Sequence, residues 1–354
     1  METTENRIIS RSDCVLVTGA NGFIGVHVLQ VLLDYGFRRI RCLIRSSRHA
    51  SQLEAMAAKY NANVEMVKGT LLSRQDCLKA CDQVAVIYHL AVGATGKSFS
   101  GAVMNVAVPT RNLLEAAAQQ KTLKRFVNVS SFAVYSNQNK PRRNVLDESC
   151  PVDERPQDRG DAYAYAKLKQ DQLVADYGKR HEIEYVTLRP GTVYGPGKAA
   201  IPGRVGIDTF GFFMHLGGSN RIPLTYVANC AEAIVLAGLV KGVAGGEVFN
   251  VVDDDLPTSR QFLRLYKRNV KPFHSIYLPH FLSYAFCWLW EKYSRWSQGQ
   301  LPLVFSCAEW HAYWKKTRYS NQKLKRALGW KMRVPTEEGL RRYFAFCKQS
   351  GTHA

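Results

Sequence analysis

The segment YAYAKLK, residues 163–169, contains a tyrosine four residues before a lysine twice. Tyr163 pairs with Lys167, and Tyr165 pairs with Lys169. A phenol has a pKa of about 10 and is a poor base at neutral pH. An ammonium group one helix turn away favours the phenolate, which can accept a hydroxyl proton as hydride leaves the substrate carbon. Any two residues four apart share a helix face, so the spacing alone does not choose between the pairs.

A glycine-rich loop indicates a second kind of chemistry. The segment VTGANGFIG places Gly19, Gly22 and Gly25 three residues apart. It lies between the apolar segment 14–18, which we predict as a buried strand, and an apolar helix over 23–36. Glycines in this context let the backbone turn tightly and approach a diphosphate, whose charge then lies at the helix N-terminus. The loop therefore predicts a dinucleotide site.

The end of the second predicted strand, residues 39–44, reports on the ribose of that dinucleotide. An acidic residue there favours a free 2′-hydroxyl, and an arginine favours a 2′-phosphate. No acidic residue occurs between Asp34 and Glu54, a gap that contains Arg38, Arg39, Arg41, Arg45 and Arg48. Arg45 and Ser46 follow the strand directly, so we expect NADP to be preferred to NAD. The alternative is that these arginines only solvate an edge.

The elements that must position these residues alternate along the chain. We predict further strands over 63–69, 85–91 and 125–131, and helices over 51–60 and 109–120, the second starting at Pro109, because proline is favoured at a first helical position. Strands alternating with helices predict an α/β fold, a doubly wound parallel Rossmann sheet covered on both faces. We expect residues 1–189 to form the dinucleotide-binding domain, with 226–255 returning to it, and 190–225 and 256–354 to form a smaller substrate-binding lobe.

Four segments in a fixed order resemble a known family. TGANGFIG, NVSSFAVY, the Tyr-x-x-x-Lys segment and LRPGTVYGPG are similar to the extended short-chain dehydrogenase/reductase superfamily. The resemblance is to its NAD-dependent epimerase/dehydratase branch, which includes 3β-hydroxysteroid dehydrogenase-like enzymes. It implies an NAD(P)-dependent enzyme that acts on a secondary hydroxyl group or epimerises it.

The resemblance also assigns catalytic roles. In the family the residue before the active lysine is usually small, and Ala166 precedes Lys167, so the resemblance implies that Tyr163 and Lys167 are the active pair. The third hydroxyl would be Ser131, four residues before Tyr135, with Ser130 as its rival. Phe132 and Ala133 follow where the family's dehydratases carry an Asp-Glu pair, which disfavours dehydration.

Cofactor contacts follow from the loop, from the second strand and from the resemblance. Lys167 would hold the nicotinamide ribose, Ala91 would pass close to the cofactor, and Asn105 matches the asparagine that opens the family's fourth helix. Thr70 stands where the family often has an aspartate near the adenine. The complete expected set is Gly19, Asn21, Gly22, Phe23, Ile24, Gly25, Arg45, Ser46, Thr70, Leu71, Leu90, Ala91, Val92, Asn105, Val129, Tyr163, Lys167, Pro190 and Val193. We expect no metal site.

Charge and aromatic content bear on the substrate. The net charge is +19, and residues 256–354 carry 18 Lys and Arg against 4 acidic residues. A basic lobe suits a nucleotide sugar, which we place first, with Arg204 and Arg221 as candidate contacts. The second candidate is a hydrophobic alcohol or ketone, because Asn229 and the aromatic segment 273–314 are closer to the steroid-dehydrogenase side. A cofactor-binding regulator without turnover is the third.

The remaining expectations concern compartment and partners. The N-terminus is polar, and nine scattered cysteines form no C-x-x-C pair, which favours reduced thiols and a cytoplasmic chain. Segment 273–314 could rest on a membrane surface, although packing inside the small lobe is the simpler interpretation. No nucleic-acid-binding module is recognisable. By family resemblance we expect a homodimer formed through helices at 105–120 and 161–178.

Overall fold

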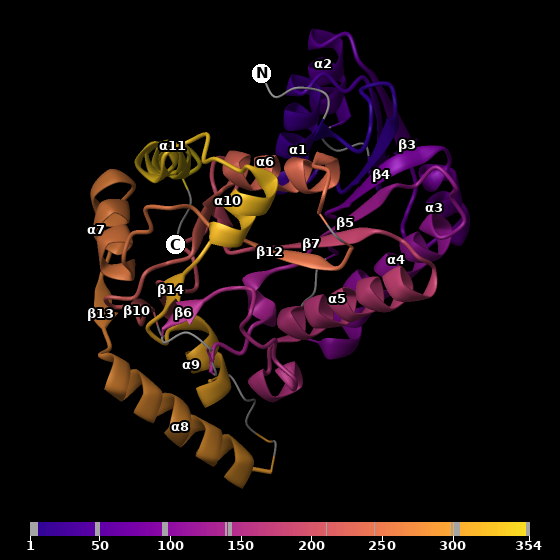
Figure 1. Ribbon diagram of the computed structural model, residues 1–354. Coiled ribbons are helices and arrows are strands. Elements are labelled where there is room, and N and C mark those ends of the chain that lie inside the picture. Colours follow the sequence, from indigo (N-terminus) through magenta and orange to yellow (C-terminus); the bar gives the residue numbers. More distant parts are fainter. Residues whose placement is uncertain are drawn as a thin grey trace.

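A computed structural model describes residues 6–351 apart from 47–49, 94–97, 139, 141–143, 210, 244, 299 and 301–304. Its centre is a seven-stranded sheet in the order β12-β7-β5-β4-β1-β2-β3, in which every neighbouring pair is parallel (Figure 1). The strands are β1 (Cys14–Thr18), β2 (Arg39–Ile44), β3 (Asn63–Lys68), β4 (Val84–His89), β5 (Arg125–Val129), β7 (Tyr185–Pro190) and β12 (Glu247–Val251). The predicted α/β fold with a parallel Rossmann sheet is confirmed.

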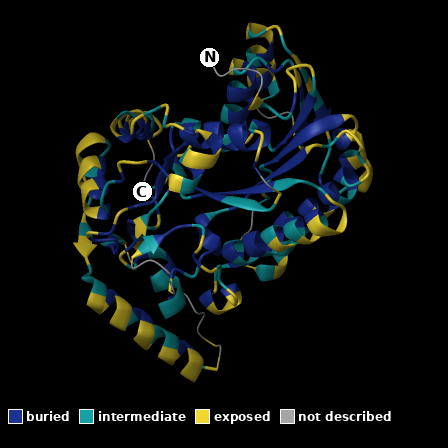
Figure 2. Cartoon of the chain, viewed as in Figure 1, coloured by how far each residue is buried: buried dark blue, intermediate teal, exposed yellow. Residues whose placement is uncertain are grey.

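Two helical layers cover the sheet because the strands carry apolar side chains on both faces. One face packs against α1 (Phe23–Asp34), α2 (Ala50–Lys59) and α6 (Val227–Leu239). The other packs against α3 (Arg74–Cys81), α4 (Phe99–Ala117) and α5 (Ala162–Arg180). Figure 2 shows the central strands as the most completely buried part of the chain.

The second lobe combines short strands with the C-terminal helices. Three small sheets pair β8 (Thr192–Tyr194) with β11 (Leu224–Tyr226), β6 (Val145–Leu146) with β14 (Arg318–Tyr319), and β10 (Phe212–His215) with both β9 (Gly206–Thr209) and β13 (Ser275–Tyr277). The helices are α7 (Ser259–Asn269), α8 (His280–Trp296), α9 (Cys307–Tyr313), α10 (Gln322–Leu328) and α11 (Thr336–Gln349). Two short 3₁₀ segments, η2 (Phe132–Val134) and η3 (Pro156–Arg159), complete the elements.

The two lobes are not formed by two continuous segments of the chain. Segment 226–255 contributes the edge strand β12 to the central sheet and α6 to the helical layer that covers one of its faces. Residues 322–330 lie in the range that we expected to belong to the substrate lobe. They nevertheless contribute Leu324, Leu328 and Trp330 to the core between the sheet and α1 and α6.

The predicted start of the fourth helix is wrong. Helix α4 begins at Phe99, and both Asn105 and Pro109 lie inside it. A proline inside a helix removes the hydrogen bond to the carbonyl four residues earlier, here that of Asn105. The backbone N–H of Gly93 donates to that carbonyl oxygen at 3.0 Å. The loop after β4 thus satisfies the group that Pro109 leaves open, and the helix continues through the proline.

Candidate active site

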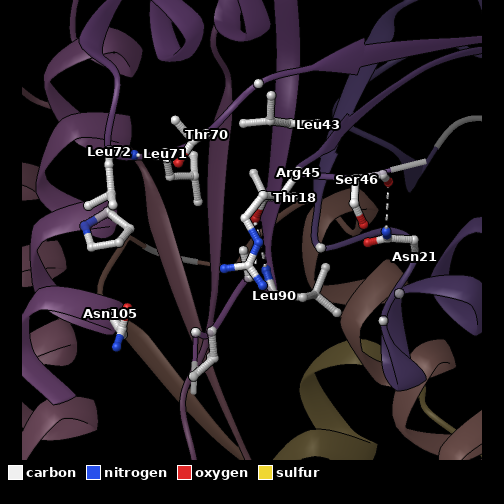
Figure 3. Close-up of a pocket in the computed structure, with 18 of the residues that line it drawn as sticks. Thr18, Asn21, Leu43, Arg45, Ser46, Thr70, Leu71, Leu72, Leu90 and Asn105 are labelled. Carbon is white, nitrogen blue, oxygen red and sulfur yellow. Dashed lines mark hydrogen bonds between the residues drawn. The ribbon is translucent and has the colours of Figure 1, made fainter. Parts of the chain in front are cut away.

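A cavity of about 440 Å³ opens at the carboxyl ends of β1, β2, β3 and β4 (Figure 3). Its walls come from the glycine loop, the ends of these strands and one side of α4. Most expected cofactor residues line it: Gly19, Asn21, Gly22, Phe23, Ile24, Gly25, Arg45, Ser46, Thr70, Leu71, Leu90, Ala91, Val92 and Asn105. The sequence interpretation missed Thr18, Leu43, Gly69, Leu72, Gly93 and Pro109, which line the same cavity.

The glycine loop lines this cavity with a tight backbone turn. Gly19 has a φ of 72°, which favours glycine, and its carbonyl accepts the N–H of Gly22 at 3.0 Å. Gly22 is the N-cap of α1, where no side chain caps the helix. A Cβ atom on Gly25 would lie 2.1 Å from the oxygen of Gly19. The loop is therefore a backbone cradle at an uncapped helix N-terminus, which suits a diphosphate.

A buried hydrogen-bonded chain fixes the floor of the cavity. The Oγ1 atom of Thr18 lies 2.9 Å from Nδ1 of His89 and accepts the N–H groups of Leu90 and Ala91. Nε2 of His89 lies 2.9 Å from Oγ1 of Thr110 on α4. Burial, with a further contribution from the charge of Lys167, lowers the pKa of His89 to about 3, so the imidazole is neutral. The side chains of Thr18, His89 and Thr110 thus join β1, β4 and α4 directly beside the glycine loop.

Arg45 is the one charged residue among the described residues that line the cavity, and none of those residues is acidic. Figure 3 shows its guanidinium group pointing into the cavity beside Leu90, while Asn21 reaches across the mouth towards the carbonyl of Ser46. Three other arginines of the same segment have partners elsewhere. Arg38 bonds the carbonyls of Leu33 and Phe37, Arg39 bonds that of Ser12, and Arg41 pairs with Glu65 at 2.7 Å. Arg48 lies outside the described residues.

Ser131 and Tyr163 meet at the end of β5. The Ser131 side chain lies beside the Tyr163 phenol, and its Oγ atom accepts the N–H of Ala133 at 3.1 Å. Burial raises the pKa of the Tyr163 phenol, and the neighbouring Ser131 hydroxyl opposes this rise. The phenol is therefore protonated in the protein alone. The two predicted hydroxyl groups lie together.

Lys167 lies one turn further along α5 and is only 2% exposed. Its Nζ atom donates to the carbonyl of Val129 and to Oε1 of Gln170, both at 2.8 Å. Burial lowers the pKa of Lys167 to about 8, and the charge of Asp171 opposes the shift. Val129, expected as a cofactor contact, thus holds the lysine through its backbone.

A network of buried polar side chains supports this lysine. Gln170 donates to Asn128, and Asn128 donates to Asp171, each at 2.9 Å. Asp171 also accepts the hydroxyl of Ser130 at 2.9 Å and the guanidinium of Arg189 at 3.2 Å. The rival serine, Ser130, is therefore committed to Asp171, while Ser131 contacts Tyr163.

The second tyrosine–lysine pair lies on another side of α5. The Nζ atom of Lys169 is 5.7 Å from the ring centre of Tyr165, whose ring edge meets Phe99. Both residues line a separate surface pocket with Glu154 and Pro156.

Four further residues that we expected to contact cofactor or substrate do not line the glycine-loop cavity. Pro190 ends β7 opposite Val251, and Val193 on β8 packs against both lobes. The guanidinium of Arg204 donates to the carbonyl of Ala312 at 2.9 Å and lies 5.0 Å from the ring centre of Tyr313. Arg221 is exposed and donates to the carbonyl of Leu256. Across the described part of the chain, no cluster of three His, Cys, Asp or Glu residues could hold a metal.

A match to a protein-family model assigns this chain to a family. The model of the NAD dependent epimerase/dehydratase family matches residues 15–251. The chain belongs to this family. It is therefore an enzyme of the NAD-dependent epimerase/dehydratase type, as the order of its motifs predicted.

Two curated relatives represent different substrates. The chain is 28% identical over 251 residues to a 4-hydroxy-2-methyl-3-oxo-4-farnesyl-3,4-dihydroquinoline-1-oxide ketoreductase of Stigmatella aurantiaca, covering 70% of this chain and 71% of that protein. It is 28% identical over 253 residues to a trifunctional UDP-glucose 4,6-dehydratase/UDP-4-keto-6-deoxy-D-glucose 3,5-epimerase/UDP-4-keto-L-rhamnose-reductase of Arabidopsis thaliana. That match covers 67% of this chain but only 36% of the trifunctional protein.

Solved structures share the fold over nearly the whole chain. UDP-glucuronic acid 4-epimerase from Bacillus cereus, in complex with UDP-glucuronic acid and NAD, superposes with a TM-score of 0.70 at 22% identity. The superposition covers 95% of this chain and 99% of the epimerase. At this identity the likeness concerns the fold.

Proposed function

We propose that this family member is an NAD(P)-dependent oxidoreductase that interconverts a secondary alcohol and its ketone through Ser131, Tyr163 and Lys167. One observation carries the proposal. The side chains of Ser131 and Tyr163 are neighbours at the carboxyl edge of the same sheet that carries the glycine-loop cavity, with Lys167 one helix turn away. A bound dinucleotide cofactor supplies or accepts the hydride.

The protein's side chains would handle the proton. Ser131 donates a hydrogen bond to the substrate oxygen and orients it against the Tyr163 hydroxyl. Tyr163, a phenol with a raised pKa, is protonated and so is ready to give a proton to the oxygen of a ketone as it is reduced. Lys167, held by Val129 and Gln170, supplies the positive charge that stabilises the resulting phenolate. In the oxidation direction the same phenolate removes the hydroxyl proton.

The cavity also supports a preference for NADP. Arg45 is the charged side chain directed into it, and no carboxylate among its described lining residues could accept a ribose 2′-hydroxyl. A guanidinium group forms bidentate hydrogen bonds with phosphate and is always charged. A 2′-phosphate therefore fits the ribose end better than a free hydroxyl.

For the substrate we favour a hydrophobic ketone or alcohol, which the sequence alone placed second. Arg204 and Arg221, the candidate contacts of a nucleotide diphosphate, are engaged with backbone carbonyls in the second lobe. The ketoreductase of Stigmatella aurantiaca, by its name, acts on a farnesylated ketone. A nucleotide sugar is the second candidate, supported by the trifunctional UDP-sugar enzyme.

A two-part experiment tests these proposals. Thermal shifts would be recorded with NADPH and with NADH, and then with UDP, with UDP-glucose and with a steroid ketone in the presence of NADPH. We expect a larger shift with NADPH than with NADH, and a further shift with the ketone. A further shift with UDP alone would decide for the nucleotide sugar. Oxidation of NADPH on adding the ketone, followed by absorbance, would establish turnover, and the absence of any cofactor shift would refute the proposed site.

A further inference from the structure

Helix α8 is amphipathic in the opposite sense to an ordinary surface helix. Its inner side carries the small residues Ser283, Cys287 and Ser294, which are 1%, 3% and 7% exposed. Its outer side carries large apolar residues, which we call the α8 apolar face: Phe281, Leu282, Trp288, Leu289, Tyr293 and Trp296. Phe281 and Trp296 are 72% and 77% exposed. A helix whose outer side met only water would show the reverse arrangement.

The aromatic segment 273–314 therefore has two parts. Phe305 and Trp314 are buried, and Trp290 packs against Phe305, so these rings build the lobe as the simpler interpretation expected. The α8 apolar face is different because its rings point outward along a helix that projects from the body of the protein (Figures 1 and 2). An exposed apolar face of this length marks a contact surface.

The charges around the helix indicate what that surface contacts. Helix α8 itself carries Lys292 and Arg295 against one acidic residue, Glu291, and it belongs to a strongly basic region, because residues 256–354 contain 18 Lys and Arg against 4 acidic residues. Glu291 itself pairs with Arg295 and accepts the N–H of Cys307. Lys292, which is exposed, lies 5.8 Å from the ring centre of Trp288. A second copy of this face would bring like charges together, whereas an anionic surface would complement them.

We propose that α8 docks in the interface of an anionic lipid bilayer, with its apolar face among the acyl chains and the neighbouring cations at the headgroups. Aromatic rings beside lysine and arginine on an interfacial helix bind lipid in this way. No helix in the described part of the chain is long and apolar enough to cross a bilayer, so the contact is peripheral.

The docking helix is connected to the candidate active site through α9. The indole N–H of Trp310 on α9 donates to Ser283 of α8 at 2.9 Å. Three residues later, the hydroxyl of Tyr313 donates to Asp161 at 2.8 Å, and Asp161 caps the start of the helix that carries Tyr163. Two hydrogen bonds, through Trp310 and Tyr313 of α9, thus link α8 to the start of α5. The helix also lies on the lobe that would receive a lipid-dissolved ketone. Only this last point rests on the proposed function.

Vesicle co-sedimentation of the full chain tests the proposal. The vesicles would be phosphatidylcholine with phosphatidylglycerol, and phosphatidylcholine alone. We expect binding to the anionic vesicles that falls as salt is added, and weak binding to the neutral ones. The double variant Phe281→Ser/Trp296→Ser should bind the anionic vesicles at least about tenfold less, because two exposed rings no longer enter the bilayer. The matched control is Met104→Ser/Leu78→Ser, which removes two exposed apolar side chains from α4 and α3 and should bind like the parent.

Each other outcome overturns the docking proposal. Absence of binding to anionic vesicles at low salt would refute it, as would equal binding by the Phe281→Ser/Trp296→Ser variant. A dimer in sedimentation velocity that this variant converts to a monomer, without vesicle binding, would assign the face to a second copy of the chain. The NADPH-dependent thermal shift of the same variant should stay unchanged, which separates failure of docking from failure of the cofactor site.

Discussion

The glycine-loop cavity and the α8 apolar face follow opposite rules of construction. Beneath the cavity and beside Lys167, buried polar groups have defined hydrogen-bond partners: Thr18 holds His89, and Asp171 holds Ser130 and Arg189. On α8, the fully buried positions hold small residues, and most of the large apolar residues are exposed. A buried polar group left without a hydrogen-bond partner costs considerable free energy, whereas an exposed ring needs no fixed partner. The first region is therefore built for one geometry, and the second for adhesion to an extended surface.

The largest loss of activity should come from removing the phenol oxygen of Tyr163. Tyr163→Phe deletes the proton donor while keeping the ring, so kcat should fall on the order of 10³-fold. NADPH affinity, measured by thermal shift, should stay near that of the parent. Tyr165→Phe is the matched control, because that ring packs on Phe99 away from Ser131. Full activity in Tyr163→Phe would remove the basis of the proposed chemistry.

Asp171→Asn should be the next largest change, because it breaks the buried network at its most connected member. The guanidinium of Arg189 and the hydroxyl of Ser130 would lose a charged acceptor, and the free energy of unfolding should decrease by about 3 kcal/mol in urea titration. If Asp171 were only a solvated residue of α5, the loss would stay below about 0.5 kcal/mol.

The same variant makes a prediction about pH. The pKa of Lys167 is about 8 in the parent, so the ammonium form is lost, and kcat/KM falls, as pH rises through about 8. The charge of Asp171 raises this pKa, so its removal lowers it further. The alkaline limb of the pH profile should therefore move to lower pH in Asp171→Asn. An unchanged limb would show that Lys167 does not control it.

Arg45→Asp tests whether the cavity selects its dinucleotide by charge. Losing a charge-assisted hydrogen bond to a phosphate and adding a like charge should weaken NADP binding roughly 10- to 100-fold. NAD has no 2′-phosphate, so its affinity should change much less. Arg39→Asp is the charge-matched control, since Arg39 contacts the carbonyl of Ser12 instead. Equal losses for both cofactors would remove the 2′-phosphate role.

How far the sequence predicted each region depends on whether the determining contacts are local. Strand β1, strand β2 and the start of α1 were predicted at their observed residues because apolar runs and glycine spacing are local signals. The role of His89 was not visible, since its partner Thr18 is 71 residues away. The resemblance already favoured Ser131 over Ser130, but the hydrogen bond of Ser130 to Asp171, 41 residues further along the chain, was not visible from local spacing. The start of α4 was misplaced because Gly93 satisfies the carbonyl of Asn105 through space.

The smallest expected effect is a change in stability on α8, where an exposed and a buried position can be compared. Trp296→Ser removes the most exposed aromatic side chain of α8, yet the free energy of unfolding should change by less than about 0.5 kcal/mol, because that ring is 77% exposed. Ser283→Val adds apolar volume on the same helix and should destabilise the protein by about 1–3 kcal/mol. The reason is that Ser283 is 1% exposed and accepts the indole N–H of Trp310, which would be left buried without a partner. Urea denaturation of both variants without lipid checks this. If the order were reversed, α8 would be an ordinary core helix, and its outward rings would contribute to the fold and not to a contact surface.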